Sequence, residues 1–233
     1  MQNHDFKMKM WEFDTKESML NLLIGKSFGN DPAKRMEEIR IAKIERATSI
    51  FTLLELNSDA VVIEIGSGSG VMANWMAPKV KYLHCCDISK SFLEVAREEC
   101  QNSDNVFFHL VQTRKLDFAG EGTIDAVFSN NVFIHLNLYD IFIYFREFQR
   151  IVKTGGKVWF DITNSDILAD KIPEYFYEML GYYETNSLFA MSSLLRFNSP
   201  VAIVGIARHF GFKQISATGT DNLSLLFIKD ASP

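Results

Sequence analysis

The amino-acid sequence predicts an α/β fold, a doubly wound and mostly parallel sheet of about seven strands whose last strand is antiparallel. Short apolar runs of strand length alternate with amphipathic stretches of helical length from about residue 60 onward. The run at 61–65 enters a glycine-rich turn, which is typical of a buried parallel strand that leads to a ligand site. Apolar runs at 212–217 and 223–228 flank a short polar turn and predict a closing hairpin.

The composition is consistent with one sizeable cytoplasmic domain. The chain has 233 residues, of which 47% are hydrophobic and 23% are charged. Its formal net charge of -5 and its pI near 5.6 argue against a nucleic acid as the main substrate, because nucleic-acid binders usually carry a basic face. The first ten residues lack the apolar core of a signal peptide, and no apolar run reaches the roughly 20 residues of a membrane span.

Residues 1–56 are expected to form N-terminal helices before the main domain. A capped short helix is predicted over residues 14–25, and a second helix, which an Asp-Pro pair begins, over about 32–56. The charged residues of the second helix are expected to form a solvated face. Two aromatic residues before the first helix, Trp11 and Phe13, either pack against the domain or belong to a lid over the active site.

The run at 61–65 is followed by glycines on alternate positions, Gly66, Gly68 and Gly70. Glycines leave the main chain open to a ligand, and the next segment, 71–77, is predicted as a helix whose first N–H groups face the same point. A dinucleotide fingerprint would need its third glycine one residue later, and a phosphate-binding P-loop would need Gly-Lys-Ser/Thr. Neither is present, so the pattern predicts a loop for a different nucleotide cofactor.

The next predicted strand, 80–86, stops at an acid, Asp87. In a parallel sheet, residues at the carboxyl ends of neighbouring strands gather at the crevice where ligands bind. A carboxylate at this place can accept hydrogen bonds from both hydroxyls of a ribose. The alternative is that Asp87 caps the helix that starts at Ser89, although Ser89 could itself be that cap.

The three cysteines, Cys85, Cys86 and Cys100, lack metal-ligand spacing, and the first two lie inside an apolar run. We therefore expect buried free thiols in a reducing cytoplasm, and no metal site. His109 lies inside a predicted strand and is expected to be structural.

The remaining elements continue the alternation, with helices predicted at 89–101, 139–152 and 200–211 and strands at 106–110, 123–131 and 158–162. The helix at 139–152 is apolar on all sides, so it is either largely buried or in contact with a hydrophobic partner or a second subunit. The glycine-containing segment at 153–157 is predicted as the turn before the next strand. Between 163 and 199 the alternation stops, and aromatic residues crowd into an insertion.

The pattern Glu-x-Gly-x-Gly-x-Gly at 64–70 resembles motif I of the class I S-adenosylmethionine-dependent methyltransferases. The acid after the next strand, the Ile-Asp-x-Val-x-Ser-Asn segment at 124–130 and the Gly-Gly turn at 155–156 follow in the order of that family's motifs. A glycine loop alone would be a weak signal, whereas four motifs in register are specific. The resemblance covers roughly residues 60–229 and is to the small-molecule, type 11-like branch.

The resemblance implies a Rossmann-like methyltransferase fold over residues 57–233. It also implies a helical cap. It also implies S-adenosylmethionine as cofactor, with S-adenosylhomocysteine as product, and a substrate cover at about 163–199. Glu64 would order the glycine loop or the methionine end of the cofactor, and Asp87 would hold its ribose. The full set of positions that the resemblance assigns to the cofactor is Glu64, Gly66, Ser67, Gly68, Gly70, Asp87, Ile88, Gln112, Thr113 and Asn130.

Three of these positions need comment. Gln112 and Thr113 stand where the family usually has an acid followed by a small residue near the adenine, so this chain departs from the pattern there. Asn130 or Asn131 would lie beneath the methionine moiety. Family members that methylate bases or side-chain amides often carry Asn/Asp-Pro-Pro-Tyr/Phe at this strand end, and its absence points away from those acceptors.

His135 is the candidate catalytic residue. Methyl transfer from a sulfonium is a direct displacement, so the protein mainly aligns the nucleophile, the methyl carbon and the sulfur and keeps water out. A base helps when the nucleophile is a hydroxyl or a protonated amine, and His135 follows the strand that would end near the methyl group. The alternative is that His135 only bonds the backbone.

The expected function is methyl transfer to an oxygen or nitrogen of a small-molecule acceptor. Two alternatives remain open, namely methylation of a macromolecule, protein or RNA, and a module that binds the cofactor without transferring the methyl group. A basic surface patch would favour the first alternative. A methyl site filled by aromatic side chains would favour the second.

Overall fold

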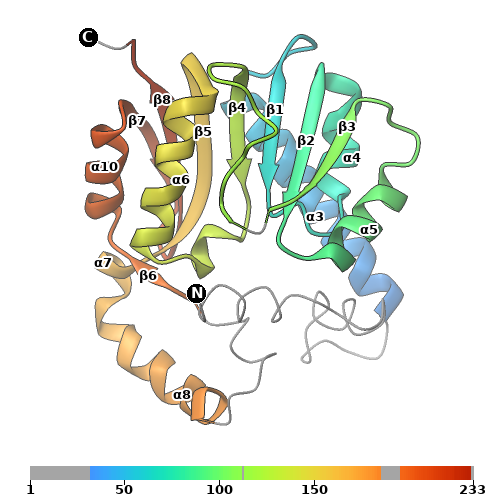
Figure 1. Ribbon diagram of the computed structural model, residues 1–233. Helices are drawn as coiled ribbons and strands as arrows, with labels where there is room; N and C mark the ends of the chain where they lie inside the picture. The colour runs from blue at the N-terminus through green and yellow to red at the C-terminus, as the bar shows by residue number, and fades with distance from the viewer. Residues whose placement is uncertain (1–31, 112, 185–194, 232–233) are drawn as a thin grey trace. The chain divides into compact units, whose positions relative to one another are not determined.

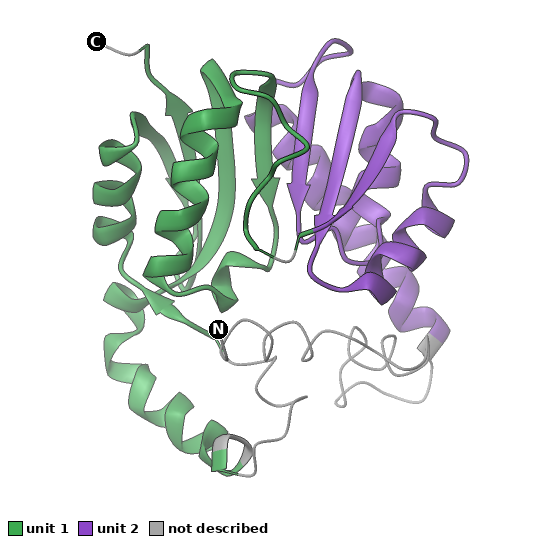
Figure 2. Ribbon diagram, in the orientation of Figure 1, with its two compact units in different colours: residues 1–10, 111–233 green, residues 11–110 purple. Residues whose placement is uncertain are grey.

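The computed structural model describes residues 32–111, 113–184 and 195–231 of the chain (Figure 1). The chain divides into two compact units, each described by itself (Figure 2). The glycine-loop unit contains the described residues up to Leu110, and the C-terminal unit contains those from Val111 onward. The short helix predicted over 14–25 and the aromatic pair Trp11 and Phe13 lie outside the described residues.

Parallel strands in the order β3-β2-β1 form the sheet of the glycine-loop unit. They are β1 (Val61–Ile65), β2 (Tyr82–Asp87) and β3 (Val106–Leu110). β1 is buried from its second residue onward, which agrees with the continuous apolar pattern of a strand covered on both faces. Ile65 pairs with Cys86, so the turn after β1 begins beside the end of β2.

The helices of the glycine-loop unit are α3 (Pro32–Leu53), α4 (Val71–Met76), the 3-10 turn η1 (Ala77–Lys79) and α5 (Lys90–Glu99). α3 packs along α4, where the rings of Phe51 and Trp75 meet edge to face with centroids 6.0 Å apart. Ser89 caps α5, because its Oγ accepts a hydrogen bond from the N–H of Phe92 at 3.2 Å. The cap that the sequence suggested is therefore Ser89.

α3 ends at Leu53, before the predicted end at about residue 56. Glu55 adopts a left-handed conformation with a φ of 55°. The N–H of Leu56 donates to the carbonyl of Phe51, and the N–H of Glu55 to that of Thr52, both at 3.1 Å. These bonds form the Schellman pattern of a helix C-terminus. A glutamate takes the place of the usual glycine, so the common stop signal is missing from the sequence.

The sheet of the C-terminal unit has the order β4-β5-β8-β7, and β6 pairs with β5. Its strands are β4 (Ile124–Ser129), β5 (Val152–Asn164), β6 (Phe197–Asn198), β7 (Phe212–Thr218) and β8 (Asn222–Lys229). β4 and β6 run parallel to β5, whereas β8 runs antiparallel to both β5 and β7. The closing hairpin and the antiparallel last strand are therefore confirmed.

The turn predicted at 153–157 is instead an irregular part of β5. The pairing of β4 with β5 shifts register between Ile124 and Ala126, and Gly155 takes a φ of 79°. A Cβ on Gly156 would lie 2.9 Å from the carbonyl oxygen of Asp125. The two glycines therefore serve a bulge inside a long strand, and a bulge has the same residue signature as a turn.

The apolar helix predicted at 139–152 is α6 (Leu138–Ile151). A capping box begins it, with Asn137 Oδ1 accepting from the N–H of Asp140 at 2.9 Å. Its apolar residues are largely buried, and the ring of Phe145 contacts the rings of Phe160 and Phe227. Burial against its own unit thus accounts for most of the apolar surface of α6, although Tyr139 stays 73% exposed.

The other helices of the C-terminal unit are η2 (Phe133–His135), α7 (Ser165–Leu168), η3 (Ala169–Lys171), α8 (Ile172–Glu184) and α10 (Pro200–His209). The insertion predicted at about 163–199 contains α7, η3, α8 and β6, so it is largely helical where the structure describes it. None of the described helices combines the length and the apolarity that crossing a membrane requires.

Candidate functional site

The glycine loop at 66–70 has the backbone that its glycines allow. Gly66, Gly68 and Gly70 have φ values of 75°, 52° and 78°, a region that side chains with a Cβ rarely adopt. A Cβ on Gly70 would lie 2.8 Å from the Cα of Ala96, so this glycine lets α4 and α5 pack closely. A Cβ on Gly68 would meet no described atom within 4 Å. Gly70 therefore serves the fold, whereas Gly68 faces open space.

Asp87 anchors this loop. Its Oδ2 accepts a hydrogen bond from the N–H of Gly68 at 2.9 Å, and its Oδ1 accepts one from the N–H of Ser89 at 3.0 Å. The helix-end alternative is thus partly right, because Asp87 stabilises the start of α5 while Ser89 supplies the side-chain cap. Ile88, between these two residues, is half-buried.

Glu64 and Ser67 place two buried polar atoms around the same loop. Glu64 is 2% exposed and Ser67 is 5% exposed. Within the described part of the chain, Glu64 Oε2 and Ser67 Oγ have no hydrogen-bond partner. Burial raises the pKa of Glu64 to about 8, against the lowering effect of the nearby Lys43. Buried polar groups without partners are uncommon in folded proteins and fit a site that a polar ligand completes.

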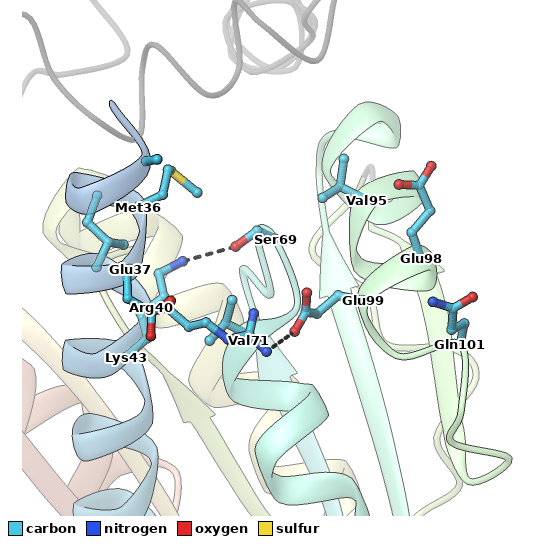
Figure 3. A pocket seen from close by; sticks show the side chains of 12 residues that line it. Met36, Glu37, Arg40, Lys43, Ser69, Val71, Val95, Glu98, Glu99 and Gln101 are labelled. Atoms are coloured by element: carbon cyan, nitrogen blue, oxygen red, sulfur yellow. Dashed lines mark hydrogen bonds and ion pairs between the residues drawn. The ribbon is translucent and has the colours of Figure 1, made fainter. Parts of the chain in front are cut away.

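Lys43 comes to the loop from α3. Its Nζ donates a hydrogen bond to Ser69 Oγ at 3.3 Å, and its side chain is half-buried (Figure 3). Burial lowers the pKa of Lys43, and the charges of Glu64 and Asp87 oppose that shift. The expectation of a solvated charged face on α3 is therefore wrong for Lys43. The sequence holds a signal for it, because Lys43 lies four residues before Ala47 and so falls on the buried stripe of the helix.

A groove of about 610 Å³ opens beside the loop in the glycine-loop unit. Residues of α3, the glycine loop, α4 and α5 line it, among them Lys43, Ser69 and Val95 (Figure 3). On its wall Arg40 forms an ion pair with Glu99 at 2.7 Å. The two basic residues of α3 in the groove, Arg40 and Lys43, therefore differ in their partners. Arg40 has an acidic partner within ion-pair distance, whereas Lys43 donates to the hydroxyl of Ser69.

The predicted site residues of the C-terminal unit lie at the end of β4 and beyond. Asn130 is half-buried, and its Oδ1 is a buried atom without a hydrogen-bond partner among the described residues. Asn131 has a φ of 59°, and its N–H donates to Asp161 Oδ1 at 2.8 Å. Thr113 is exposed, whereas Gln112 lies outside the described residues.

His135 ends the 3-10 turn η2 and is half-buried. Its backbone N–H donates to the carbonyl of Val132 at 2.9 Å. The insertion holds the residues on either side of it, because Arg196 N–H donates to the carbonyl of Ile134 at 2.6 Å and Asn198 Nδ2 donates to that of Leu136 at 2.8 Å. These bonds fix the backbone of His135, and its role as a base stays a prediction.

The insertion contains both packed and exposed aromatic residues. Tyr175 packs against Phe197 with ring centroids 5.2 Å apart, and its hydroxyl accepts a hydrogen bond from the N–H of Leu195 at 2.9 Å. Phe176 and Tyr177, on α8, are 56% and 79% exposed. Tyr175 therefore stabilises the insertion, and the exposed pair offers apolar surface.

Two further predictions concern the glycine-loop unit. His109 Nε2 lies 3.0 Å from His84 Nδ1, and burial, with His84 and Arg97 beside it, lowers the pKa of His109 to about 4. A neutral histidine paired across two strands is structural, as expected. Cys85, Cys86 and Cys100 are free and buried. Across the described ranges no cluster of three or more metal-ligating side chains was found.

Parts of the chain are similar in sequence to known methyltransferases. Residues 63–160 match the family model described as a methyltransferase domain. Ribosomal RNA small subunit methyltransferase A of Syntrophus aciditrophicus is 28% identical over 99 residues, which are 41% of this chain and 35% of that protein. The chain spans only about a third to a half of the length of the curated relatives it matches.

Solved structures match over nearly the whole chain. Geranyl diphosphate C-methyltransferase from Streptomyces coelicolor, in complex with Mg²⁺, geranyl diphosphate and S-adenosylhomocysteine, gives a TM-score of 0.70 at 10% identity and covers 98% of each chain. Magnesium protoporphyrin IX methyltransferase from Synechocystis, with bound S-adenosylhomocysteine, gives 0.65 at 14% identity, covering 93% of this chain and 95% of that one. The solved structures confirm the Rossmann-like methyltransferase fold. The family model that matches residues 63–160 agrees with the family that the motifs resemble.

Proposed function

We propose that the protein transfers a methyl group from S-adenosylmethionine to an oxygen or nitrogen of a small molecule. The match of residues 63–160 to a methyltransferase domain supports this proposal. One observation carries this proposal. Among the described residues, the glycine loop has an open side at Gly68, next to buried polar atoms of Glu64 and Ser67 that have no hydrogen-bond partner there. A cofactor with both apolar and charged parts suits such a cradle.

The residues of the glycine-loop unit would bind the cofactor. In this proposal Gly66 and Gly68 admit it to the main chain, Glu64 faces its methionine end and Asp87 holds its ribose. The place of Asp87 at the carboxyl end of β2, where it accepts a hydrogen bond from the N–H of Gly68, supports the ribose role. The bound cofactor supplies the electrophilic methyl group, and the protein's part is binding, alignment and exclusion of water.

His135 would act as the base in the C-terminal unit. Its backbone is held on both sides by bonds from the insertion, which supports a role that needs a fixed position. Neutral imidazole can accept the proton of a hydroxyl or ammonium nucleophile near pH 7. Asn130, whose Oδ1 has no hydrogen-bond partner in the described part of the chain, is proposed as a further cofactor residue. That Thr113 and Gln112 bind near the adenine stays a prediction.

A small acceptor is favoured over a macromolecule. The net charge of -5 supports this choice, and so do the small substrates in the names of the two solved methyltransferases. The match to a ribosomal RNA methyltransferase is the observation that favours RNA as the rival acceptor. The three free, buried cysteines are consistent with action in the reducing cytoplasm.

Transfer from tritium-labelled S-adenosylmethionine into a fractionated cell extract tests both the activity and the class of acceptor. We expect label in the low-molecular-mass fraction. The transfer rate of His135→Gln should be lower than that of the native protein by about 100-fold or more, as for loss of a general base. His209→Gln is the matched control, because His209 is an exposed histidine of the same unit. Label only in RNA or protein would overturn the small-molecule proposal, and no transfer at all would favour the binding module.

A further inference from the structure

Lys43 is a desolvated cation whose described neighbourhood lacks a full counter-charge. Its ammonium carries three N–H donors, and the structure shows one hydrogen bond from it, to Ser69 Oγ at 3.3 Å. Among the described residues Lys43 has no carboxylate within the 4.0 Å of an ion pair. Arg40, one turn earlier on α3, does have one in Glu99. A partly buried charge without a paired anion is costly, so its place beside the glycine loop suggests an anionic ligand.

Glu64 and Asp87 do not fill this need. Glu64 is close enough to affect Lys43 electrostatically, but burial favours its neutral form, since its pKa is raised to about 8. The charge of Asp87 also raises the pKa of Lys43, but among the described residues no ion pair joins Asp87 to Lys43. The loop therefore offers a buried acid at Glu64 and a cation at Lys43. That combination matches a zwitterion whose ammonium donates a hydrogen bond to the carboxyl group of Glu64 and whose carboxylate faces the ammonium of Lys43.

We propose that Lys43 binds the carboxylate of the amino-acid end of S-adenosylmethionine and so makes the site specific for cofactors that carry that carboxylate. The proposal rests on the proposed function for the identity of the cofactor. It adds a residue from α3, outside the strands and loops that carry the motifs. The bond from Lys43 to Ser69 keeps the ammonium at the loop before the ligand arrives.

The competing explanation is that Lys43 only supports the loop. In that case it would hold Ser69 and offset the charge of Glu64, and its loss would weaken every ligand that uses the loop. Ligands that share the adenosine part but differ in the amino-acid part separate the two roles. S-adenosylhomocysteine has the carboxylate, whereas 5′-methylthioadenosine lacks the whole amino-acid end.

Calorimetric titration of the full chain with both ligands tests the proposal in the native protein and in Lys43→Met. We expect Lys43→Met to weaken S-adenosylhomocysteine by about tenfold to about a hundredfold, the range of one charge-assisted hydrogen bond. Its affinity for 5′-methylthioadenosine should change by no more than about twofold. Equal losses for both ligands, or no loss for either, would overturn the proposal.

Two further measurements keep the test decisive if Lys43→Met folds poorly. Lys43→Arg keeps the charge and should retain most of the affinity for S-adenosylhomocysteine. The native protein should bind S-adenosylmethionine about tenfold or more tighter than its decarboxylated form. Arg40→Met is the matched control from the same groove and should leave both affinities within about twofold. Failure of the native protein to bind S-adenosylhomocysteine would instead overturn the proposed function.

Discussion

Glu64 shows how much of the site depends on single side chains. It follows three apolar residues of β1 and is buried like the last two of them, yet it is an acid. The sequence predicted its burial in the strand before the glycine loop, and its role toward the cofactor stays a prediction. It did not predict that Lys43 would reach the same loop, because the contact with Ser69 joins residues 26 positions apart, and only the packing of α3 on α4 brings them together.

The raised pKa of Glu64 predicts a pH dependence of stability. The pKa rises from 4.5 to about 8 on folding, so the folded protein holds this proton more tightly than the unfolded chain does. The free energy of unfolding should therefore fall as the pH rises from about 4.5 to about 8. Urea denaturation of the native protein and of Glu64→Gln over this range is the measurement.

Glu64→Gln should remove that part of the pH dependence, because an amide does not titrate. Glu45→Gln is the control, since Glu45 is an exposed glutamate of the same unit. The curve of Glu45→Gln should follow that of the native protein. Identical pH slopes in the native protein and in Glu64→Gln would show that Glu64 is already ionised in the fold.

At the scale of elements, the hydrophobic periodicity predicted most helices and strands correctly. β3 has the bounds that the sequence predicted, and α6 differs from its prediction by one residue at each end. The errors have local causes. α3 ends at a left-handed glutamate rather than a glycine, and the Gly155-Gly156 pair forms a bulge in β5 rather than a turn. In both cases the residue types fit two backbone solutions, and tertiary pairing decides between them.

Two similar substitutions in the glycine loop should differ in their effects on stability and on cofactor binding. Gly70→Ala should destabilise the protein by about 3 kcal/mol or more, because the new Cβ is forced against Ala96 in a left-handed conformation. Gly68→Ala should cost only about 1 kcal/mol of backbone strain, because its Cβ meets open space. Yet Gly68→Ala should impair binding of S-adenosylhomocysteine more, because the methyl group occupies the space left for the cofactor.

Urea denaturation and calorimetry of the two variants check this contrast. A larger loss of stability in Gly68→Ala than in Gly70→Ala would mean that the open side of Gly68 is closed in the protein. Unchanged affinity in Gly68→Ala would mean that the cofactor does not approach this side of the loop.

At the scale of the whole molecule, the order of motifs identified the fold better than any one motif did. The motif at 64–70 lies in the glycine-loop unit, and the motifs at 124–130 and 155–156 lie in the C-terminal unit. Their common order along the chain matches a methyltransferase domain, and the solved structures extend the likeness to nearly the full length. The identity of the methyl acceptor is harder to predict from the sequence, because the sequence of the insertion between β5 and β6 follows no periodic pattern.

The most direct test of the account is whether the glycine-loop unit binds the cofactor through Asp87. Calorimetric titration of the full chain with S-adenosylmethionine, S-adenosylhomocysteine and NAD should give micromolar binding of the first two and none of NAD. Asp87→Ala removes the acceptor of the Gly68 N–H and should weaken both by about tenfold or more, whereas the exposed Asp59→Ala should not. Binding of NAD, or of neither sulfur compound, would contradict the account.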